Sequence, residues 1–394
     1  MKPDTQHAPH PPRMALAHLS AGFIAVLVGY TSSAAIVFQA ARAAGAGPAE
    51  IASWLWALGL GMALTSIGLS LRYRMPVLTA WSTPGAALLA TGLAGVPMSE
   101  AIGAFMFASA LIALAGVSGG FERLMHLVPR SLAAALLGGV LLRFGLEVFA
   151  RLPEQGWIIG SMLTCFLLAR RLLPRYAVPA TLLAGLLVAG LRGEVHLAGL
   201  SFQLALPVFT MPAFSPTTLI GVGLPLFIVT MASQNVPGLA VLRANGYEPP
   251  TSSLVGWTGL TGFMLAPFGG FAYNLAAITA AICMSRDADP DPSQRFRASI
   301  WAGVFYGLTG LFGATVAALF AAFPQALILA IAGLALLGTI GNSLAGALQD
   351  ETERDAALIT FLAAASGFSL WGIGSAFWAL LLGLICTALA RRSA

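Results

Sequence analysis

The chain has 394 residues, of which 58% are hydrophobic and 9% are charged, and its net charge is +5. Soluble domains carry about 25% charged residues, so this composition excludes a soluble multidomain protein. It also excludes a disordered chain, which would need few apolar residues. Long apolar runs such as 326–336 (ALILAIAGLAL) lack the alternation of strands in a transmembrane β-barrel. The composition therefore predicts an all-α polytopic membrane protein.

Fourteen segments are apolar enough to be membrane spans, each of which needs about 20 residues. The first seven begin near Leu19, Ala52, Val77, Ala101, Ser131, Trp157 and Val178. The second seven begin near Leu219, Ser253, Gly270, Ser299, Gln325, Ala356 and Ser375. Residues 1–18, which precede the first span, form a short polar tail without the apolar core of a signal peptide.

The basic residues predict the orientation of the spans. With the N-terminus inside, sixteen of the twenty Lys and Arg residues fall on inner segments and three on outer segments. This bias predicts that both termini are cytoplasmic. The basic residues are dispersed among the inner loops, which does not favour nucleic-acid binding.

The two halves of the chain read alike. Residues 129–132 (PRSL) open the fifth span and 324–327 (PQAL) open the twelfth, while Trp54 and Trp257 each begin a glycine-spaced helix. Because each half has seven spans, an odd number, the second half enters the membrane from the opposite side. The sequence thus predicts a 7+7 inverted repeat, as in secondary transporters.

The third and tenth spans are predicted to be broken half-helices. In 79–85 (TAWSTPG), Ser82 or Thr83 can cap a helix that has Pro84 in its first turn. In the counterpart, 267–274 (PFGGFAYN), Asn274 is expected to cap a helix over 275–284. We expect Thr83 and Asn274 to lie within about one ligand length of each other near the bilayer centre.

These half-helices define a candidate substrate site. Helix N-termini attract a small anion, and an aromatic ring could stack on Trp81, Phe271 or Tyr273. The alternative for Trp81 and Tyr273 is ordinary helix packing. Polar clusters on the first and eighth spans complete the site, unless they only join helices. The candidate residues are Tyr30, Thr31, Ser32, Trp81, Ser82, Thr83, Gly85, Ser233, Gln234, Asn235, Gly270, Phe271, Tyr273 and Asn274.

Arg143 and Glu147 are the charged residues predicted to lie well inside a span. Their spacing of four lets them pair on one helix face. They are either a structural ion pair near the membrane edge, which we favour, or a proton or gating pair. His18 and His126 lie at span edges and are expected at the interface. No catalytic motif and no metal-spaced His or Cys cluster is present.

Four segments together resemble the benzoate:proton symporter (BenE) family. They are 21–33 (AGFIAVLVGYTSS), 79–85 (TAWSTPG), 230–235 (TMASQN) and 266–272 (APFGGFA). The resemblance extends from about His18 to the C-terminus. It implies a bacterial inner-membrane protein that imports benzoate with protons and uses no cofactor.

The resemblance also implies a fold similar to that of the uracil/xanthine permeases and sulfate transporters. Such proteins have a core domain (spans 1–4 and 8–11) and a gate domain (spans 5–7 and 12–14). On this division, residues 1–18 are the cytoplasmic tail and 193–216 are an extracytoplasmic linker. Residues 19–128 and 217–323 form the core, and 129–192 and 324–394 form the gate.

The chain departs from the nucleobase permeases at two positions. Those proteins commonly carry acidic residues where this chain has Gln234 and Tyr273. Neutral residues suit an anionic substrate, which a fixed carboxylate would repel. The proton then travels with the substrate itself, or Glu147 carries it.

Three rival functions stay open at this point. They are transport of another small anion or a nucleobase, an anion channel, and a membrane-embedded enzyme. Paired broken helices favour one closed central site over the continuous pore of a channel. The sequence does not decide the oligomeric state, and a homodimer is one of the options.

Overall fold

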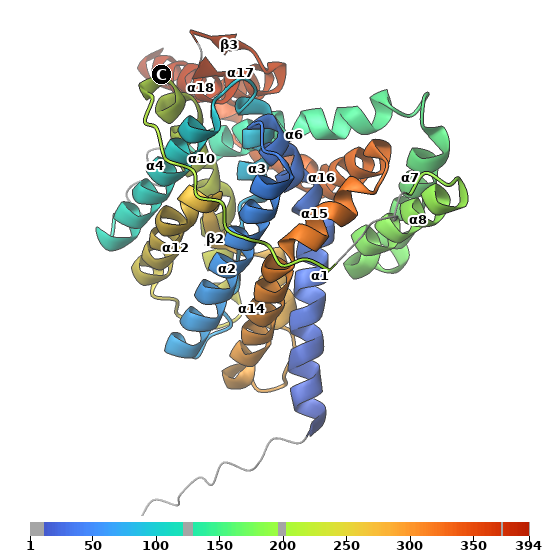
Figure 1. The fold of residues 1–394 in the computed structure, drawn as a ribbon. Coiled ribbons are helices and arrows are strands. Elements are labelled where there is room, and N and C mark those ends of the chain that lie inside the picture. Colours follow the sequence, from blue (N-terminus) through green and yellow to red (C-terminus); the bar gives the residue numbers. More distant parts are fainter. Residues whose placement is uncertain (1–11, 121–128, 196–201, 372, 394) are drawn as a thin grey trace, which may run out of the picture.

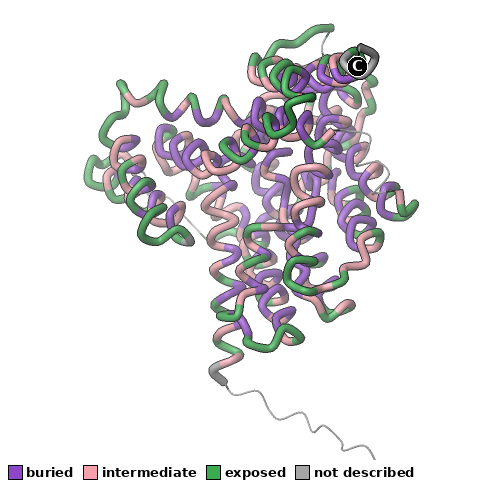
Figure 2. The backbone as a smooth tube through the Cα atoms, turned by 180° about the vertical axis from the view of Figure 1, so that it is seen from behind, coloured by how far each residue is buried: buried purple, intermediate pink, exposed green. Residues whose placement is uncertain are grey.

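The computed structural model describes residues 12–120, 129–195, 202–371 and 373–393. Long helices run roughly parallel through the centre of the molecule, with α1, α2, α12 and α14 among them (Figure 1). Buried positions are concentrated along these central helices (Figure 2). His126 and residues 1–11 of the predicted tail lie outside the described residues.

The helices are numbered in chain order. Those of the first half are α1 (Pro12–Ala43), α2 (Pro48–Tyr73), α3 (Thr83–Gly92), α4 (Met98–Val117), α6 (Arg130–Ala150), α7 (Gly156–Leu172) and α8 (Ala177–Leu191). Those of the second half are α9 (Pro216–Thr218), α10 (Leu224–Thr230), α11 (Val236–Ala244), α12 (Thr251–Leu265), α13 (Ile278–Cys283), α14 (Phe296–Leu311), α15 (Gly313–Ala321), α16 (Gln325–Ala347), α17 (Arg354–Ser366) and α18 (Ser375–Ser393).

Four short strands form two antiparallel pairs. β1 (Thr79–Trp81) pairs with β2 (Tyr273–Leu275), and β3 (Ser369–Leu370) pairs with β4 (Ile373–Gly374). The first pair joins segments almost two hundred residues apart.

Each of the fourteen predicted spans meets a helical segment, but not all of these segments are long. Six helices in the described part of the chain are long and apolar enough to cross a membrane: α1, α2, α4, α6, the composite helix Pro216–Ala244, and α16. A bent pair, α14 and α15, changes direction by 67° and could form a seventh span. The structure is therefore that of a polytopic helical membrane protein, and the count of fourteen spans stays a prediction.

The central helices approach closely at glycines. A Cβ atom added to Gly59 of α2 would lie 2.5 Å from the Cα of Gly310 on α14. On α4, a Cβ added to Gly116 would lie 2.2 Å from the backbone nitrogen of Gly256 on α12. Small residues at such crossings permit the backbone contact by which membrane helices gain dispersion energy.

A second set of helices packs around α6 and α16. Helix α6 packs against α16 and α17, α17 packs against α18, and α7 packs against α8. Figure 1 shows α7 and α8 together on one side of the molecule. The division into a core and a gate domain stays a prediction.

The segment 202–215 is an extended chain that crosses one end of the central group (Figure 1). The N–H of Ala205 donates to Leu311 at 2.8 Å, that of Thr210 to Pro267 at 2.8 Å, and that of Ala213 to Ser99 at 2.9 Å. These three acceptors all lie on ends that the orientation analysis predicts to be outside the cell. This placement suits the predicted extracytoplasmic linker.

The close crossing at Gly59 leads to a stability prediction. Gly59→Ala should lower the free energy of unfolding by about 1–3 kcal/mol, because the added methyl group forces α2 away from α14. Gly68→Ala on the same helix is the control, since nothing lies within 4 Å of a Cβ atom there. Thermal unfolding in detergent measures both variants, and equal melting temperatures for the two would contradict the packing account.

Candidate substrate site

The candidate site is built where β1 and β2 pair. Thr79 lies opposite Leu275, Ala80 opposite Asn274, and Trp81 opposite Tyr273. Both broken spans therefore meet, as predicted, and neither is a continuous helix. The close approach expected between the start of α3 and Asn274 is confirmed by this register.

Hydroxyl groups hold β1 against α2. The Oγ1 atom of Thr79 lies 2.6 Å from Oγ1 of Thr65 and 2.8 Å from Oγ of Ser66. The N–H of Thr79 donates to Ser66 at 3.0 Å, and the hydroxyl of Ser70 donates to the carbonyl of Val77 at 2.9 Å. Non-helical backbone inside a membrane protein needs such partners, because no water is available to replace them.

β2 is fixed by contacts on both of its sides. The hydroxyl of Tyr273 donates to the carbonyl of Ala57 on α2 at 2.6 Å. The N–H of Leu275 donates to the Oδ1 of Asn235 at 3.0 Å. Ala272, just before the strand, has a φ of +42°, which is strained for a residue with a side chain. The pairing with β1 maintains this conformation, because the Ala272 carbonyl accepts the N–H of Ser82 at 3.0 Å.

The predicted cap of α3 is confirmed. The Oγ of Ser82 accepts the N–H of Gly85 at 3.0 Å and the hydroxyl of Thr230 at 3.0 Å. Thr83 is half-buried, and neither its N–H nor its hydroxyl has a hydrogen-bond partner among the described residues. The N–H of Thr83 is therefore the unpaired main-chain donor in the first turn of this ten-residue half-helix.

The predicted cap of the second half-helix is wrong. Asn274 lies in β2, and α13 begins at Ile278 and has only six residues. Strand pairing with Ala80 uses the segment that was expected to start the helix. The Asn274 side chain is fully buried, its Nδ2 donates to the Ala272 carbonyl at 3.3 Å, and its Oδ1 has no partner.

The helix from Pro216 to Ala244 contains two π turns, over Leu219–Gly223 and Met231–Asn235. Each turn ends two residues before a proline, at Pro225 and Pro237 respectively. A proline has no N–H to donate to the carbonyl four residues earlier, so the main-chain hydrogen bonds of the helix shift by one residue in the preceding turn. The sequence located the loosened helix correctly but not its form.

The second π turn presents the polar residues of the eighth span. Asn235 is buried and anchors β2, and the hydroxyl of Ser233 donates to the carbonyl of Val229. Gln234 is half-buried, and its amide makes no hydrogen bond within the described residues. It lies four residues after Thr230, which bonds to the α3 cap, so Gln234 faces the same region.

Helix α6 closes this region on one side. It contacts both α3 and the π turn that carries Gln234. The site therefore lies between the central helices and the group around α6. No charged side chain is among its candidate residues, so the electrostatic attraction for an anion comes from the N-terminus of α3.

The aromatic residues divide into two sets. The Tyr30 ring packs edge-on against Trp81 at 4.9 Å, and the Trp81 Nε1–H donates to the Ser33 hydroxyl at 2.8 Å. Phe271 instead packs among the rings of Trp54 and Phe105, at 5.9 and 5.7 Å. Thus Tyr30, which is half-buried, lies beside the site, whereas Phe271 points into the core.

Five further candidates serve the packing of the site. The Tyr273 ring lies against Gly61 and Gly270, where an added Cβ would clash with it. Thr31 and Ser32 return their hydroxyls to carbonyls of their own helix. Gly85 leaves room for Leu226, whose Cδ1 would lie 2.7 Å from an added Cβ. Ordinary packing, the alternative considered for Tyr273, describes its position.

The predicted pair of Arg143 and Glu147 is not formed. Glu147 lies 3.7 Å from Arg151 instead, near the end of α6, and both side chains are substantially exposed. Arg143 is also exposed. This arrangement agrees with the structural alternative, an ion pair at the edge of a span.

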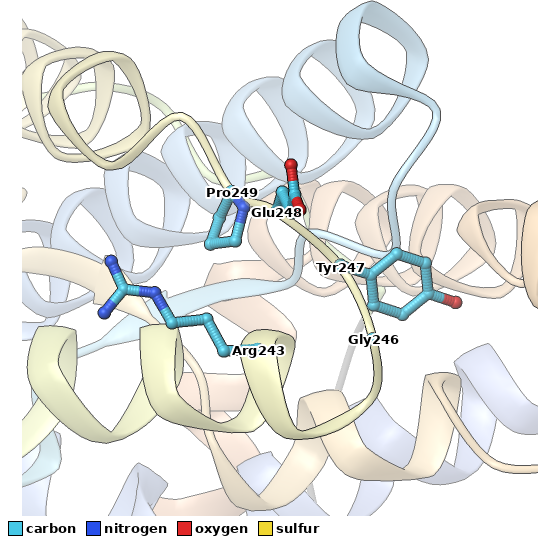
Figure 3. Close-up of a pocket in the computed structure, with 5 residues that line it drawn as sticks. All are labelled: Arg243, Gly246, Tyr247, Glu248 and Pro249. Atoms are coloured by element: carbon cyan, nitrogen blue, oxygen red, sulfur yellow. The ribbon is translucent and has the colours of Figure 1, made fainter.

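A hollow of about 460 Å³ lies elsewhere, at the end of α11. Figure 3 shows its lining residues: Arg243, Gly246, Tyr247, Glu248 and Pro249. Burial raises the pKa of the Tyr247 hydroxyl, and Arg295 nearby lowers it in part. The described residues contain no group of three His, Cys, Asp or Glu that could hold a metal ion.

Comparison with known proteins decides the family. The profile of the family described as benzoate membrane transport protein (BenE) matches residues 13–389. The chain belongs to the BenE family. It is 52% identical over 368 residues to the inner membrane protein YdcO of Escherichia coli, covering 93% of this chain and 94% of that protein. It is 39% identical over 365 residues to the benzoate membrane transport protein of Acinetobacter baylyi, covering 93% of each chain.

Solved structures share the fold of this BenE protein. The structure of SLC26A9 has a TM-score of 0.61 at 14% identity. The match covers 95% of this chain and 65% of the SLC26A9 chain. The structure of the murine Slc26a9 anion transporter in the inward-facing state also has a TM-score of 0.61, at 13% identity, with coverages of 96% and 68%. The transmembrane domain of the cyanobacterial bicarbonate transporter BicA has a TM-score of 0.53 at 13% identity, with coverages of 96% and 98%. The family and the apolar helices make the chain a multi-pass membrane transport protein and not an enzyme.

Sequence reasoning missed the hydroxyl cluster of Thr65, Ser66 and Thr79. The sequence does show these three hydroxyl residues within apolar spans, and that pattern could have indicated the cluster. It also placed His18 at an interface, whereas His18 is 2% exposed and lies 2.7 Å from Asp289. Nothing local in the sequence links residues that are 271 positions apart.

The α3 cap leads to a second prediction. Ser82→Ala should lower the free energy of unfolding by about 1–2 kcal/mol, because it removes the acceptor for two donors at the start of α3. Thr91→Ala in the same helix is the control, since that hydroxyl only bonds back to carbonyls one turn earlier. Thermal unfolding in detergent compares them, and an equal loss of stability in both variants would count against the cap.

Proposed function

We propose that this BenE protein imports benzoate, or a closely similar aromatic carboxylate, by proton symport. The observation that carries the proposal is that Thr83, at the start of α3, and the amide of Gln234 have no hydrogen-bond partner among the described residues, in a chain of this family. Thr83 offers an N–H and a hydroxyl to a carboxylate, and Gln234 offers a further N–H. The half-buried ring of Tyr30 is the natural neighbour for the aromatic ring of the substrate.

The neutral character of the site supports an anionic substrate. Donors aimed at a carboxylate stabilise it without a fixed charge, and an acidic residue at Gln234 or Tyr273 would repel it. The buried Oδ1 of Asn274, which has no partner among the described residues, could accept a hydrogen bond from a substrate bound as the acid.

We propose alternating access between two domains as the transport cycle. The core comprises 19–128 and 217–323, the gate comprises 129–192 and 324–394, and fourteen spans form a 7+7 inverted repeat. Support comes from the antiparallel meeting of β1 and β2, which start corresponding spans of the two halves. The contacts of α6 with α3 and with the π turn support a site at the boundary that such motion would open.

The proposed setting is the bacterial inner membrane, with both termini in the cytoplasm. The curated relative YdcO is an inner membrane protein, which supports the first part. The distribution of basic residues supports the second. The extended segment 202–215 then covers the outer ends of α4, α12 and α14.

Transport itself is tested in proteoliposomes. Labelled benzoate should accumulate faster than in protein-free liposomes when the outside is made acidic relative to the lumen, because neutral benzoic acid crosses a bilayer unaided and only the excess reports symport. Without the gradient, uptake should stop at equilibrium. Accumulation that ignores the pH gradient would contradict symport, and single-channel currents would identify a channel instead.

Gln234 gives a prediction about binding. Gln234→Ala should weaken benzoate binding by about 1–3 kcal/mol, which is the cost of leaving a buried polar partner unpaired. Ser233→Ala is the control, because the Ser233 hydroxyl is already bonded to its own helix. Calorimetry or ligand-induced thermal shift measures the affinities. Unchanged affinity with reduced stability in Gln234→Ala would show that this amide only joins helices.

A further inference from the structure

Three residues of the His, Asp, Glu, Lys and Arg types are deeply buried in the part of the chain whose side chains the structure describes. They are His18, Asp289 and Arg295, which are 2%, 1% and 7% exposed. All three lie together, although His18 is on α1 and the others are near the start of α14. Burial of charged groups is costly, so such a cluster needs internal partners.

The partners are present. The Nε2 of His18 lies 2.7 Å from the Oδ2 of Asp289, and the Oδ1 of Asp289 accepts the N–H of Asp291 at 2.8 Å. The Nε–H of Arg295 donates to the main-chain carbonyl of Asp289 at 2.8 Å, and its terminal N–H donates to Pro290 at 3.4 Å. The Arg295 guanidinium thus bonds to main-chain carbonyls of the loop, while the Asp289 carboxylate pairs with the His18 imidazole.

Both sides of the pair connect to the candidate site. Along α1, His18 precedes Tyr30 by twelve residues, which is about 18 Å at 1.5 Å per residue. Along the other segment, Asp289 follows Asn274 through the short helix α13. A change of charge at the pair therefore acts on two elements that supply site residues.

The site itself offers no proton carrier. Its candidate residues include no Asp, Glu or His, and Glu147 is a surface pair with Arg151 at the end of α6. The His18–Asp289 pair, by contrast, combines an imidazole, which can both bind and donate a proton, with a carboxylate 2.7 Å away.

We propose that the His18–Asp289 pair is the proton-binding site of the transport cycle. This inference rests on the proposed proton symport. In the unloaded pair, a neutral imidazole donates its Nε2–H to the ionised carboxylate. A proton from water then binds at Nδ1 and gives an imidazolium–carboxylate pair, and its release to water restores the neutral ring. Binding of the proton and of the substrate are thermodynamically linked. If the bound proton strengthens substrate binding, bound substrate strengthens proton binding by the same factor.

Other charged groups define the field around the pair. Arg295 is the buried one, and Tyr247 donates its hydroxyl to Pro292 of the same loop at 2.8 Å. The remaining groups on this loop and on the start of α14 are Arg286, Asp287, Asp291 and Arg297. From the end of α2, Arg74 also approaches this region, with its guanidinium 5.2 Å from the centre of the Phe296 ring.

The test uses His18→Gln in proteoliposomes, because glutamine keeps an N–H donor for Asp289 but does not titrate. Exchange of labelled benzoate against unlabelled benzoate should persist, whereas accumulation driven by a pH gradient should fall at least tenfold. Glu147→Gln is the matched control and should accumulate benzoate like the wild type. Asp289→Asn is the second variant and should behave like His18→Gln.

The outcomes separate the inference from the function on which it rests. If the wild type and His18→Gln both accumulate benzoate under the gradient, the pair is structural and the inference is wrong. If the wild type exchanges benzoate but ignores the gradient, proton symport fails first and the inference fails with it. If neither variant folds, proton uptake by the purified wild type on adding benzoate decides, since absence of uptake near neutral pH would overturn the proposal.

Discussion

The pairing of β1 with β2 is the constraint on which the rest of the site depends. Two spans leave the helical conformation in the middle of an apolar bundle, and their backbone groups then lack partners. Each strand supplies main-chain hydrogen-bond partners to the other, and hydroxyl groups of α2 supply further hydrogen bonds to β1. The N–H of Ser82 is held by Ala272, so α3 must begin where the strands end. The open end of that helix is thus a consequence of how two distant segments satisfy their hydrogen bonds.

Proline has a comparable role in the composite helix Pro216–Ala244. Because Pro237 has no N–H, the helix forms a π turn there and does not break. The helix therefore continues, with its main-chain hydrogen bonds shifted by one residue. The displaced turn brings Asn235 to β2 and leaves Gln234 half-buried. Adjacent residues thus differ in role: Asn235 supports β2, whereas the Gln234 amide makes no hydrogen bond within the described residues.

The features that sequence analysis predicted well are local. The cap at Ser82 follows from a serine two residues before a proline, and helix positions follow from apolar runs. The predicted cap at Asn274 failed because a strand partner from another part of the chain, Ala80, competes for that segment. The directions of Phe271 and Tyr273 depend on which face of β2 meets α2, and no local pattern encodes that choice.

Charged residues show the same limit. A spacing of four suggested that Arg143 pairs with Glu147, but Arg151 lies at the same spacing on the other side and forms the contact. The pairing of His18 with Asp289 depends on the end of α13 returning to the start of α1. Such contacts need the tertiary fold, whereas membership of the BenE family was carried by short segments that the sequence displays directly.

The central claim is that the substrate binds between the N-terminus of α3 and the π turn at Gln234. Diffraction from crystals grown with 4-iodobenzoate tests it most directly, because the iodine atom gives an anomalous signal. We predict a peak beside Tyr30, with the carboxylate directed toward Thr83 and Gln234. A peak in the loop hollow at Arg243, with none beside α3, would contradict the account.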